Sequence, residues 1–267
     1  MRDSLQLLGR YLAISVRAQL QYRAAFMAQL LGHLLATVVE FLGIWALFDR
    51  FGSLRGWTLP EIALLYGMAD VSFAIADAAA RGFDVVGSLL KSGDFDRMLL
   101  RPRSTVLQLL GHELRLSRIG RLAQGLAILV WAGHAGAIAW TGPRLALLGA
   151  ALAGGACMFF GIVVLQATSA FWTIETLEVW NAFTYGGNYA AQYPMSIYRP
   201  WFRHFFTFVI PLFAVGYLPA LAILDRPDPL GLPVALEWLG PLAGVAFLGI
   251  TLQVWRLGLR HHVSTGS

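Results

Sequence analysis

The sequence predicts an all-α membrane protein with six transmembrane helices, and three observations support this fold class. Hydrophobic residues make up 57% of the 267 residues, against roughly 45–50% in soluble proteins. Charged residues make up 13%, which is about half of the usual 25%. Apolar runs of helical length follow one another along the chain, and basic residues gather between them. This pattern argues against a water-soluble enzyme and against a nucleic-acid-binding domain.

Residues 1–23 predict an amphipathic helix that lies along the membrane surface. Leu5, Leu8, Leu12 and Val16 recur at three- and four-residue spacing, as on one face of a helix. Such a helix buries its apolar face among lipids and places its arginines near the phosphate head groups. The alternative interpretation is a solvated leader into the first span.

A transmembrane helix needs about 20 largely apolar residues, because it crosses about 30 Å of hydrocarbon at about 1.5 Å per residue. Five segments fit this description: residues 24–48, 62–80, 122–140, 145–171 and 234–257. Two further segments compete for the remaining span. Residues 205–224 are strongly apolar but contain Pro211 and Pro219, whereas residues 178–193 are more polar.

The basic residues between the spans predict the orientation of the chain. With residues 205–224 as a span, sixteen of the twenty lysines and arginines lie on the same side as both termini, and with residues 178–193 fourteen do. Basic residues concentrate in cytoplasmic loops. Either choice therefore predicts that both termini face the cytoplasm.

Residues 81–121 form the largest predicted extramembrane segment and carry eight of the twenty basic residues. Gly93 predicts the end of a helix, because glycine readily adopts the left-handed backbone of a C-cap. Asp94 can then cap a short helix, which ends before Pro102. These short helices, with apolar residues beside arginines, predict a compact knob suited to a partner's groove. The alternative is a connecting loop whose basic residues only set the topology.

Polar residues also occur inside the predicted spans. An ionisable side chain at the centre of a span costs about 2.5–3.5 kcal/mol on insertion scales, so it faces the bundle interior or an aqueous path. Glu40 in the first span and Asp70 in the second fit either packing partners in the bundle or contacts with cargo or a proton. Small residues in the fourth span predict close helix packing: Gly149, Ala150, Ala151, Gly154 and Gly155.

Three segments of the sequence resemble the ABC-2 superfamily of ATP-binding-cassette permeases, and in particular its bacterial branch of ABC-2 family transporter proteins. They are GDFDRMLLRPRS (residues 93–104), FWTIETLEVWNAFTYGGNYAAQYPMSIY (residues 171–198) and FFTFVIPLFAVGYLPAL (residues 205–221). The resemblance extends over nearly the whole chain.

The resemblance implies a six-helix permease half of ABC-2 exporter type. In the family such a half pairs with a second permease, identical or a paralogue, and sits on two cytoplasmic ATPase subunits. It implies that residues 178–193 are span five and that residues 194–230 form outer re-entrant helices. It also implies a coupling helix at residues 85–102. The residues proposed to contact the ATPase are Gly93, Asp96, Arg97, Met98, Leu99, Arg101 and Pro102, with Met98 and Leu99 filling a groove on it.

With residues 178–193 as a span, a stripe of aromatic and polar side chains recurs on it at helical spacing. Its members are Asn181, Tyr185, Asn188 and Tyr189. If the dimer axis is the translocation route, this stripe and Asp70 are the candidate lining. The alternative is hydrogen bonding between helices.

These observations predict a permease subunit, not an enzyme, of an efflux transporter in the bacterial inner membrane. The G-x-x-x-x-G-K-[ST] phosphate-binding pattern is absent from the sequence, so ATP and Mg are expected on the partner ATPase. No metal or other cofactor is expected on this chain. The expected cargo is hydrophobic or amphipathic, the other expected contacts are membrane lipids, and no nucleic acid is expected. The alternative function is a proton-coupled secondary transporter that uses Asp70 and Glu40.

Overall fold

A computed structural model describes residue 21 and residues 23–111, 119–173, 177–228 and 230–261 of the chain. Within these residues the regular structure is helical, apart from an isolated bridge between Leu54 and Trp57. The prediction of an all-α fold is therefore confirmed. The predicted amphipathic helix at residues 1–23 lies almost entirely outside the described residues.

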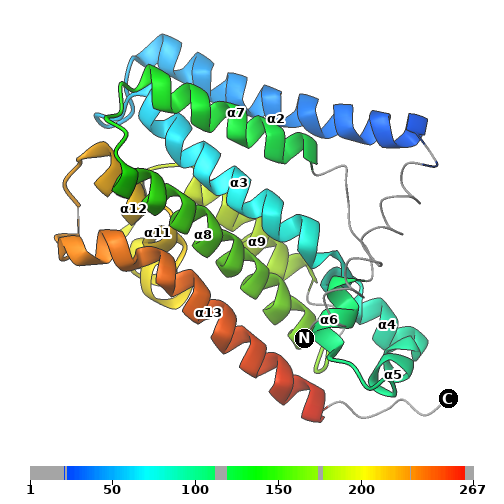
Figure 1. Cartoon of the computed structure of the whole chain (residues 1–267). Coiled ribbons are helices and arrows are strands. Elements are labelled where there is room, and N and C mark those ends of the chain that lie inside the picture. The colour runs from blue at the N-terminus through cyan, green and yellow to red at the C-terminus, as the bar shows by residue number, and fades with distance from the viewer. Residues whose placement is uncertain (1–20, 22, 112–118, 174–176, 229, 262–267) are drawn as a thin grey trace.

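Six long helices run side by side through the molecule (Figure 1). They are α2 (Arg23–Phe51), α3 (Leu59–Asp84), α7 (Ile119–Ala135), α8 (Gly142–Ser169), α9 (Leu177–Ala191) and α13 (Val234–His261). Helix α3 packs against α7 and α8, and α8 packs against α13. Helices α2 and α13 lie on opposite outer sides of the bundle, with α3 and α8 between them (Figure 1).

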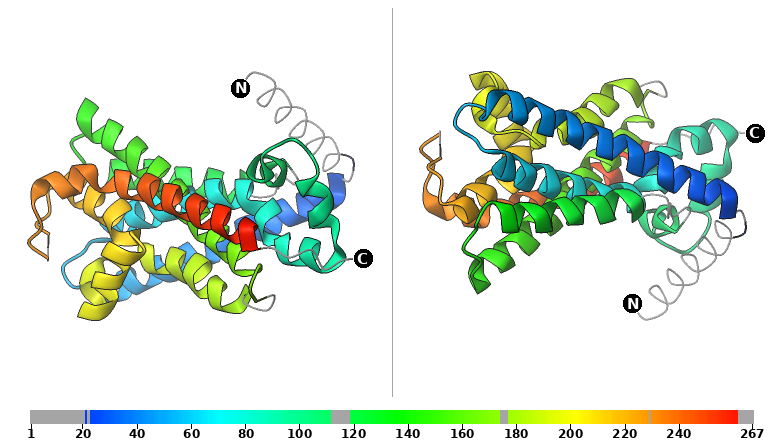
Figure 2. Two further views of the ribbon diagram at one scale, coloured as in Figure 1. Left: turned by 90° about the horizontal axis from the view of Figure 1, so that it is seen from below. Right: turned by 90° about the horizontal axis from the view of Figure 1, so that it is seen from above.

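Short helices gather at the two ends of the bundle (Figures 1 and 2). One end, called here the insert end, carries α4 (Val86–Ser92), α5 (Asp94–Leu99) and α6 (Thr105–Leu110). The opposite end, called the far end, carries η2 (Met195–Ile197), α10 (Pro200–His204), the π-helical turn η3 (Phe205–Val209), α11 (Leu212–Val215) and α12 (Tyr217–Leu224).

Four helical segments in the described part of the chain are long and apolar enough to cross a membrane. They are Met27–Phe51, Leu59–Ser92, Gly142–Ser169 and Val234–His261. A fifth results if Pro200–Val209 and Leu212–Leu224, bent by 71°, count as one span. In the described part of the chain, helix α7 has 17 residues and α9 has 15, and neither is among these candidate spans. The chain is a multi-pass membrane protein.

The bend at the far end has a local cause. Pro211 has no N–H to donate to a preceding carbonyl, which interrupts the helical ladder. Just before it, the N–H of Ile210 donates to the carbonyl of Phe205 at 3.1 Å, an i to i−5 bond typical of a π-turn. The chain therefore turns sharply here, where hydropathy alone predicted a possible straight span.

The insert helices differ in one detail from the prediction. Gly93 ends α4 with φ +73°, in the left-handed region, as predicted. However, the N-cap of α5 is Gly93 and not Asp94. The Asp94 carboxylate instead accepts hydrogen bonds from the Ser92 hydroxyl at 2.8 Å and from Arg97 Nη1 at 3.2 Å. Both donors lie within three residues, so local pairing replaces the predicted cap.

Candidate functional site

The tip of the insert presents basic and apolar side chains to the outside. The side chain of Arg97 is 81% exposed, and Arg101 and Pro102 are exposed. Leu99 is 41% exposed and Leu100 is 85% exposed. Gly93 and Asp96, also predicted to contact the ATPase, are half-buried.

Met98 does not lie where the prediction placed it. It is 8% exposed and belongs to the chain's own hydrophobic cluster at the insert end. Its side chain therefore cannot fill a groove on a partner in this arrangement. Leu100, which was not among the predicted contact residues, is the exposed apolar neighbour of Leu99.

An aromatic cluster fixes the insert to the long helices. Phe95 of α5 is fully buried, and its ring packs edge-on against Trp255 of α13 and against Phe171 just after α8. Phe83 of α3 packs against the same Trp255 ring, with centroids 5.5 Å apart. Trp255 Nε1 also donates to Thr105 Oγ1 of α6 at 3.2 Å. The insert is thus joined to three long helices through one buried indole.

The deepest polar site of the bundle is an ion pair between α3 and α7. Arg121 Nε donates to Asp70 Oδ1 at 2.6 Å, the Asp70 side chain is fully buried, and that of Arg121 is 11% exposed. The Arg121 guanidinium also lies over the Phe73 ring, 4.9 Å from its centroid. Within the described residues, Asp70 Oδ2 has no hydrogen-bond partner.

Asn188 of α9 completes this ion-pair site. In the amide orientation that satisfies both of its groups, its oxygen accepts from Arg121 Nη2 at 2.9 Å. Its nitrogen donates to the carbonyl of Ala69 at 3.2 Å. Asn188 is 1% exposed, so this member of the predicted stripe bonds between helices. Three helices meet through Asp70, Arg121 and Asn188.

Arg121 was not among the predicted site residues. It is the last basic residue of the predicted extramembrane segment, whereas in the structure it lies within α7, opposite the middle of α3. Asp70 lies 51 residues away, and no spacing rule connects residues that far apart. The only available signal was that a buried Asp70 needs a basic partner.

Glu40 and Tyr189 form a second polar contact, between α2 and α9. The Tyr189 hydroxyl donates to Glu40 Oε1 at 3.0 Å, although the Tyr189 residue is 47% exposed. Glu40 Oε2 is buried, and the described part of the chain offers it no hydrogen bond. Glu40 is thus bonded to Tyr189, whereas Asp70 is paired with Arg121.

The other two stripe residues, Asn181 and Tyr185, line a cavity of about 320 Å³ between α3, α8 and α9. It is called here the α3–α8–α9 cavity and lies in the half of the bundle toward the insert end. Its lining residues are Phe73, Ala76, Asp77, Arg81 and Asp84 from α3, Phe159, Val163 and Gln166 from α8, and Asn181, Thr184 and Tyr185 from α9. The predicted stripe is thus divided between this cavity, the buried contact of Asn188 and the partly exposed contact of Tyr189 with Glu40.

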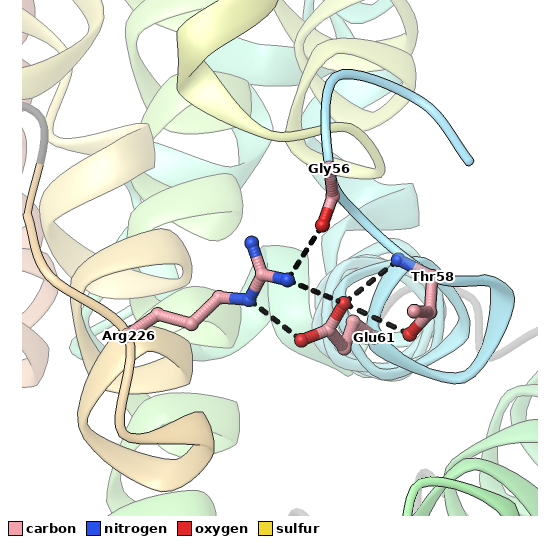
Figure 3. Close-up of polar contacts among 4 residues, drawn as sticks. All are labelled: Gly56, Thr58, Glu61 and Arg226. Atoms are coloured by element: carbon pink, nitrogen blue, oxygen red, sulfur yellow. Dashed lines mark hydrogen bonds and ion pairs between the residues drawn. The ribbon is translucent and has the colours of Figure 1, made fainter.

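A group of charged contacts at the far end, called the far-end clamp, was also not predicted (Figure 3). Arg226, which follows α12, donates from Nε and Nη2 to the two carboxylate oxygens of Glu61 at 2.6 and 3.0 Å. Its Nη2 also donates to the carbonyl of Gly56 at 2.7 Å, and its guanidinium lies 4.4 Å from the Trp57 ring centroid. Thr58 donates to the same carboxylate through its N–H at 2.7 Å and its hydroxyl at 2.8 Å.

The far-end clamp joins the α12–α13 connection to the start of α3. Asp225, beside Arg226, forms an ion pair with Arg144 near the start of α8. The pattern Thr58-x-x-Glu61 is a recognisable signal for the start of a helix, but nothing in the sequence indicates Arg226 as the partner of Glu61. No group of three or more His, Cys, Asp or Glu side chains among the described residues could hold a metal ion.

The long apolar helices define a multi-pass α-helical membrane protein. A comparison with protein families then identifies the class more closely. The family model described as ABC-2 family transporter protein matches residues 34–266, so the chain belongs to that family and the predicted resemblance is confirmed. No curated protein and no solved structure matches the chain.

Proposed function

We propose that the chain is the transmembrane permease subunit of an ATP-driven exporter in the bacterial cytoplasmic membrane. The cargo is a hydrophobic or amphipathic molecule that moves outward, and a separate ATPase subunit, present in two copies, binds ATP and Mg. Membership of the ABC-2 family supports this proposal, because the family implies an ATPase partner in a transporter complex.

The proposal includes six membrane crossings, by α2, α3, α7, α8, α9 and α13. The start of α2 and the end of α13 both lie at the insert end (Figure 1), which an even number of crossings requires. The segments Pro200–Val209 and Leu212–Leu224 are bent by 71°. Such a bend is more typical of re-entrant helices at the outer surface than of a single straight crossing. The insert end is then cytoplasmic, as the basic residues of the insert predict.

The proposed coupling of the ATPase to the long helices rests on two features of the insert: its tip is exposed, and its Phe95 side chain is buried against Trp255. Arg97 and Arg101 are positioned to pair with acidic groups of the ATPase, while Leu99 and Leu100 supply apolar contact. Phe95 and Trp255 pack the insert onto α3, α8 and α13. Nucleotide-driven movement of the ATPase would reach the helices through this cluster, provided that the nucleotide states favour different arrangements.

The proposed second permease half, identical or a paralogue, covers the side of α9 that carries Asn181, Tyr185 and Tyr189. These residues are exposed in the single chain, Tyr185 by 41% and Tyr189 by 47%. Polar groups at membrane depth normally face protein or water, because contact with lipid tails leaves them without hydrogen bonds. This face is the one proposed to line the cargo pathway between the two halves.

The ion pair of Asp70 with Arg121 favours a structural role for Asp70. Arg121 Nε occupies Asp70 Oδ1 at 2.6 Å and joins α7 to α3, whereas a proton carrier needs a carboxylate that is free to exchange its proton during each cycle. The structure therefore favours the ATP-driven function over the proton-coupled alternative with Asp70 and Glu40.

Charge reversal at the tip tests the proposed function. Arg101→Glu should weaken association with the co-expressed ATPase or uncouple ATP hydrolysis from transport, because an acidic group would then face the acidic groups of the partner. Co-purification and cargo-stimulated ATP hydrolysis are the measurements. Arg50→Glu, an exposed arginine near the end of α2, is the matched control at the far end. Full assembly and full coupling in Arg101→Glu would contradict the docking proposal.

A further inference from the structure

A second hollow of the molecule, called here the α13 groove, runs along the half of α13 nearer the far end. Its volume is about 330 Å³, and it lies between α13 on one side and η3, α11 and α12 on the other. Lining residues of α13 recur at three- and four-residue spacing: Leu236, Leu239, Ala243, Phe247 and Ile250. Such residues share one face of a helix, so the groove follows the helix axis.

A close contact between α13 and α11 forms the floor of the groove. A Cβ atom added to Gly240 would lie 2.0 Å from the Ala214 carbonyl oxygen, so only glycine allows this approach. Both residues are buried and line the groove. On the side opposite α13 the lining includes Phe208 and Val209 of η3, which are mostly exposed. The groove is therefore closed at its floor and open to the outside.

The lining of the groove is apolar. Thr207 is the one residue with a polar side chain among the described residues that line it, and its hydroxyl donates to the Arg203 carbonyl at 2.6 Å. A polar ligand would lose its bonds to water here without gaining bonds to the protein. The part of a ligand that lies in the groove must therefore be hydrocarbon.

The dimensions of the groove fit an extended chain. From Leu236 to Ile250 the helix rises about 21 Å. A helix of that length and about 10 Å in diameter occupies roughly 1,600 Å³, which is several times the volume of the groove. A helix of a partner protein therefore cannot enter the groove, whereas a single hydrocarbon chain can.

The surroundings of the groove indicate where such a chain comes from. Helix α13 is long and apolar enough to cross a membrane, and its residues Leu242 and Val245, beside the groove, are apolar and more than half exposed. Trp238, level with the start of the groove, is 41% exposed, and tryptophan concentrates where a span meets the head groups. The groove ends just past the middle of the helix, the depth that an acyl chain of one leaflet reaches.

We propose that the α13 groove binds one acyl chain of a membrane phospholipid from the leaflet at the far end. The chain packs between Phe208 and Val209 on one side and Leu239 and Ala243 on the other. It stays bound longer than the surrounding lipids, because fixed walls on several sides provide dispersion contacts along its length. The site goes beyond the proposed function, since it requires only this chain in a bilayer.

Photolabelling of the full chain in vesicles tests the site. The vesicles consist of phosphatidylethanolamine and phosphatidylglycerol, with a small fraction of a phosphatidylcholine that carries a diazirine near the end of one acyl chain. Mass spectrometry of the peptides locates the label. Ala246 and Phe247, which line the groove, should be labelled several-fold more than Val245, which lies at the same depth outside it. Equal labelling at these positions would show only general lipid contact and would overturn the proposal.

Two tryptophan variants at neighbouring positions give a matched comparison. Ala246→Trp places a large side chain in the groove and should reduce the label on the remaining groove residues several-fold. Val245→Trp introduces the same side chain outside the groove and should leave that label unchanged. Both positions are exposed, so both variants should fold, which size-exclusion chromatography checks. Equal groove labelling in the two variants would contradict acyl-chain binding, and the comparison within the unmodified chain depends on neither variant.

The outcome is separable from that of the proposed function. Selective groove labelling in a chain that fails to assemble with an ATPase would support the lipid site and contradict the exporter. Assembly and transport without selective labelling, as expected if a protein segment covers the groove, would do the reverse.

Discussion

At the scale of single residues, the buried ion pair of Asp70 and Arg121 is the most demanding feature of the molecule. A buried charge is tolerated when an opposite charge and further hydrogen bonds compensate it. Arg121 receives this compensation from Asp70, from Asn188 and from the Phe73 ring. Each of the four residues therefore depends on the others.

Removal of one partner should be more damaging than removal of both. Arg121→Met leaves a buried carboxylate without its counter-charge and should cost about 3–5 kcal/mol of the free energy of unfolding. Asp70→Leu together with Arg121→Met should cost less than either single change. The measurement is thermal unfolding in detergent, with size-exclusion chromatography as the readout, and it compares the stability of the single and double variants. A double variant less stable than both single variants would contradict the energetic coupling of the two charges.

Asp70 itself could be predicted from the sequence, because a carboxylate in an apolar run is conspicuous. Its partner Arg121 could not be predicted, because it lies at the edge of a basic segment that the sequence predicts to be a loop.

Helical periodicity predicts the polar stripe of α9, but it does not distinguish side chains that line a cavity from side chains that bond between helices. Asn181 and Tyr185 line the cavity, whereas Asn188 bonds to α3 and α7.

At the scale of helices, small residues set how closely α8 and α13 approach. A Cβ atom added to Gly154 would overlap the backbone of Pro241 in α13, and one added to Gly244 would overlap the backbone of Gly154. Close approach at glycine is the usual way in which membrane helices gain packing contacts. The prediction of close packing in this helix fits Gly154, whereas an added Cβ at Gly149 would have no neighbour within 4 Å.

This difference provides a matched pair of variants in one helix. Gly154→Val should force α8 and α13 apart and reduce the yield of folded, monodisperse protein several-fold, because backbone cannot move aside as a flexible side chain can. Gly149→Val should have little effect, since its added methyl groups meet open space in the single chain. Similar yields for the two variants would refute the packing interpretation.

Hydropathy locates the long helices but not their ends, because the cost of exposing apolar residues sets only the approximate length of a helix. The predicted span at residues 234–257 and helix α13 (Val234–His261) begin at the same residue, but the helix continues to His261. Helix α7 differs: it ends at Ala135 and not near residue 140. The apolar residues after Ala135 continue the hydropathy signal, although Gly136 and the positive φ of Ala137 (48°) have already ended the helix.

At the scale of the whole molecule, the arrangement predicts which membrane face each end occupies. The insert end carries the exposed basic tip, and the far end carries the clamp and the bent helices. The positive-inside rule applied to this arrangement predicts that the insert faces the cytoplasm.

Thiol labelling tests this orientation directly. In a Cys157→Ser background, which removes the single native cysteine, Leu100→Cys should react with an impermeant maleimide in inside-out vesicles only. Ser53→Cys, in the exposed turn between α2 and α3, should react in right-side-out vesicles only. The opposite labelling pattern would reverse the proposed topology and, with it, the docking of an ATPase at the insert.

The far-end clamp has a mechanical consequence. Arg226 donates to both carboxylate oxygens of Glu61 and to the Gly56 carbonyl, and Asp225 pairs with Arg144 near the start of α8. The start of α3, the start of α8 and the α12–α13 connection are therefore fixed to one another at the far end. A movement that enters the long helices at Trp255, at the insert end, should then rotate them about the far-end clamp, with the largest displacement at the insert end and the smallest beside the Arg226 guanidinium.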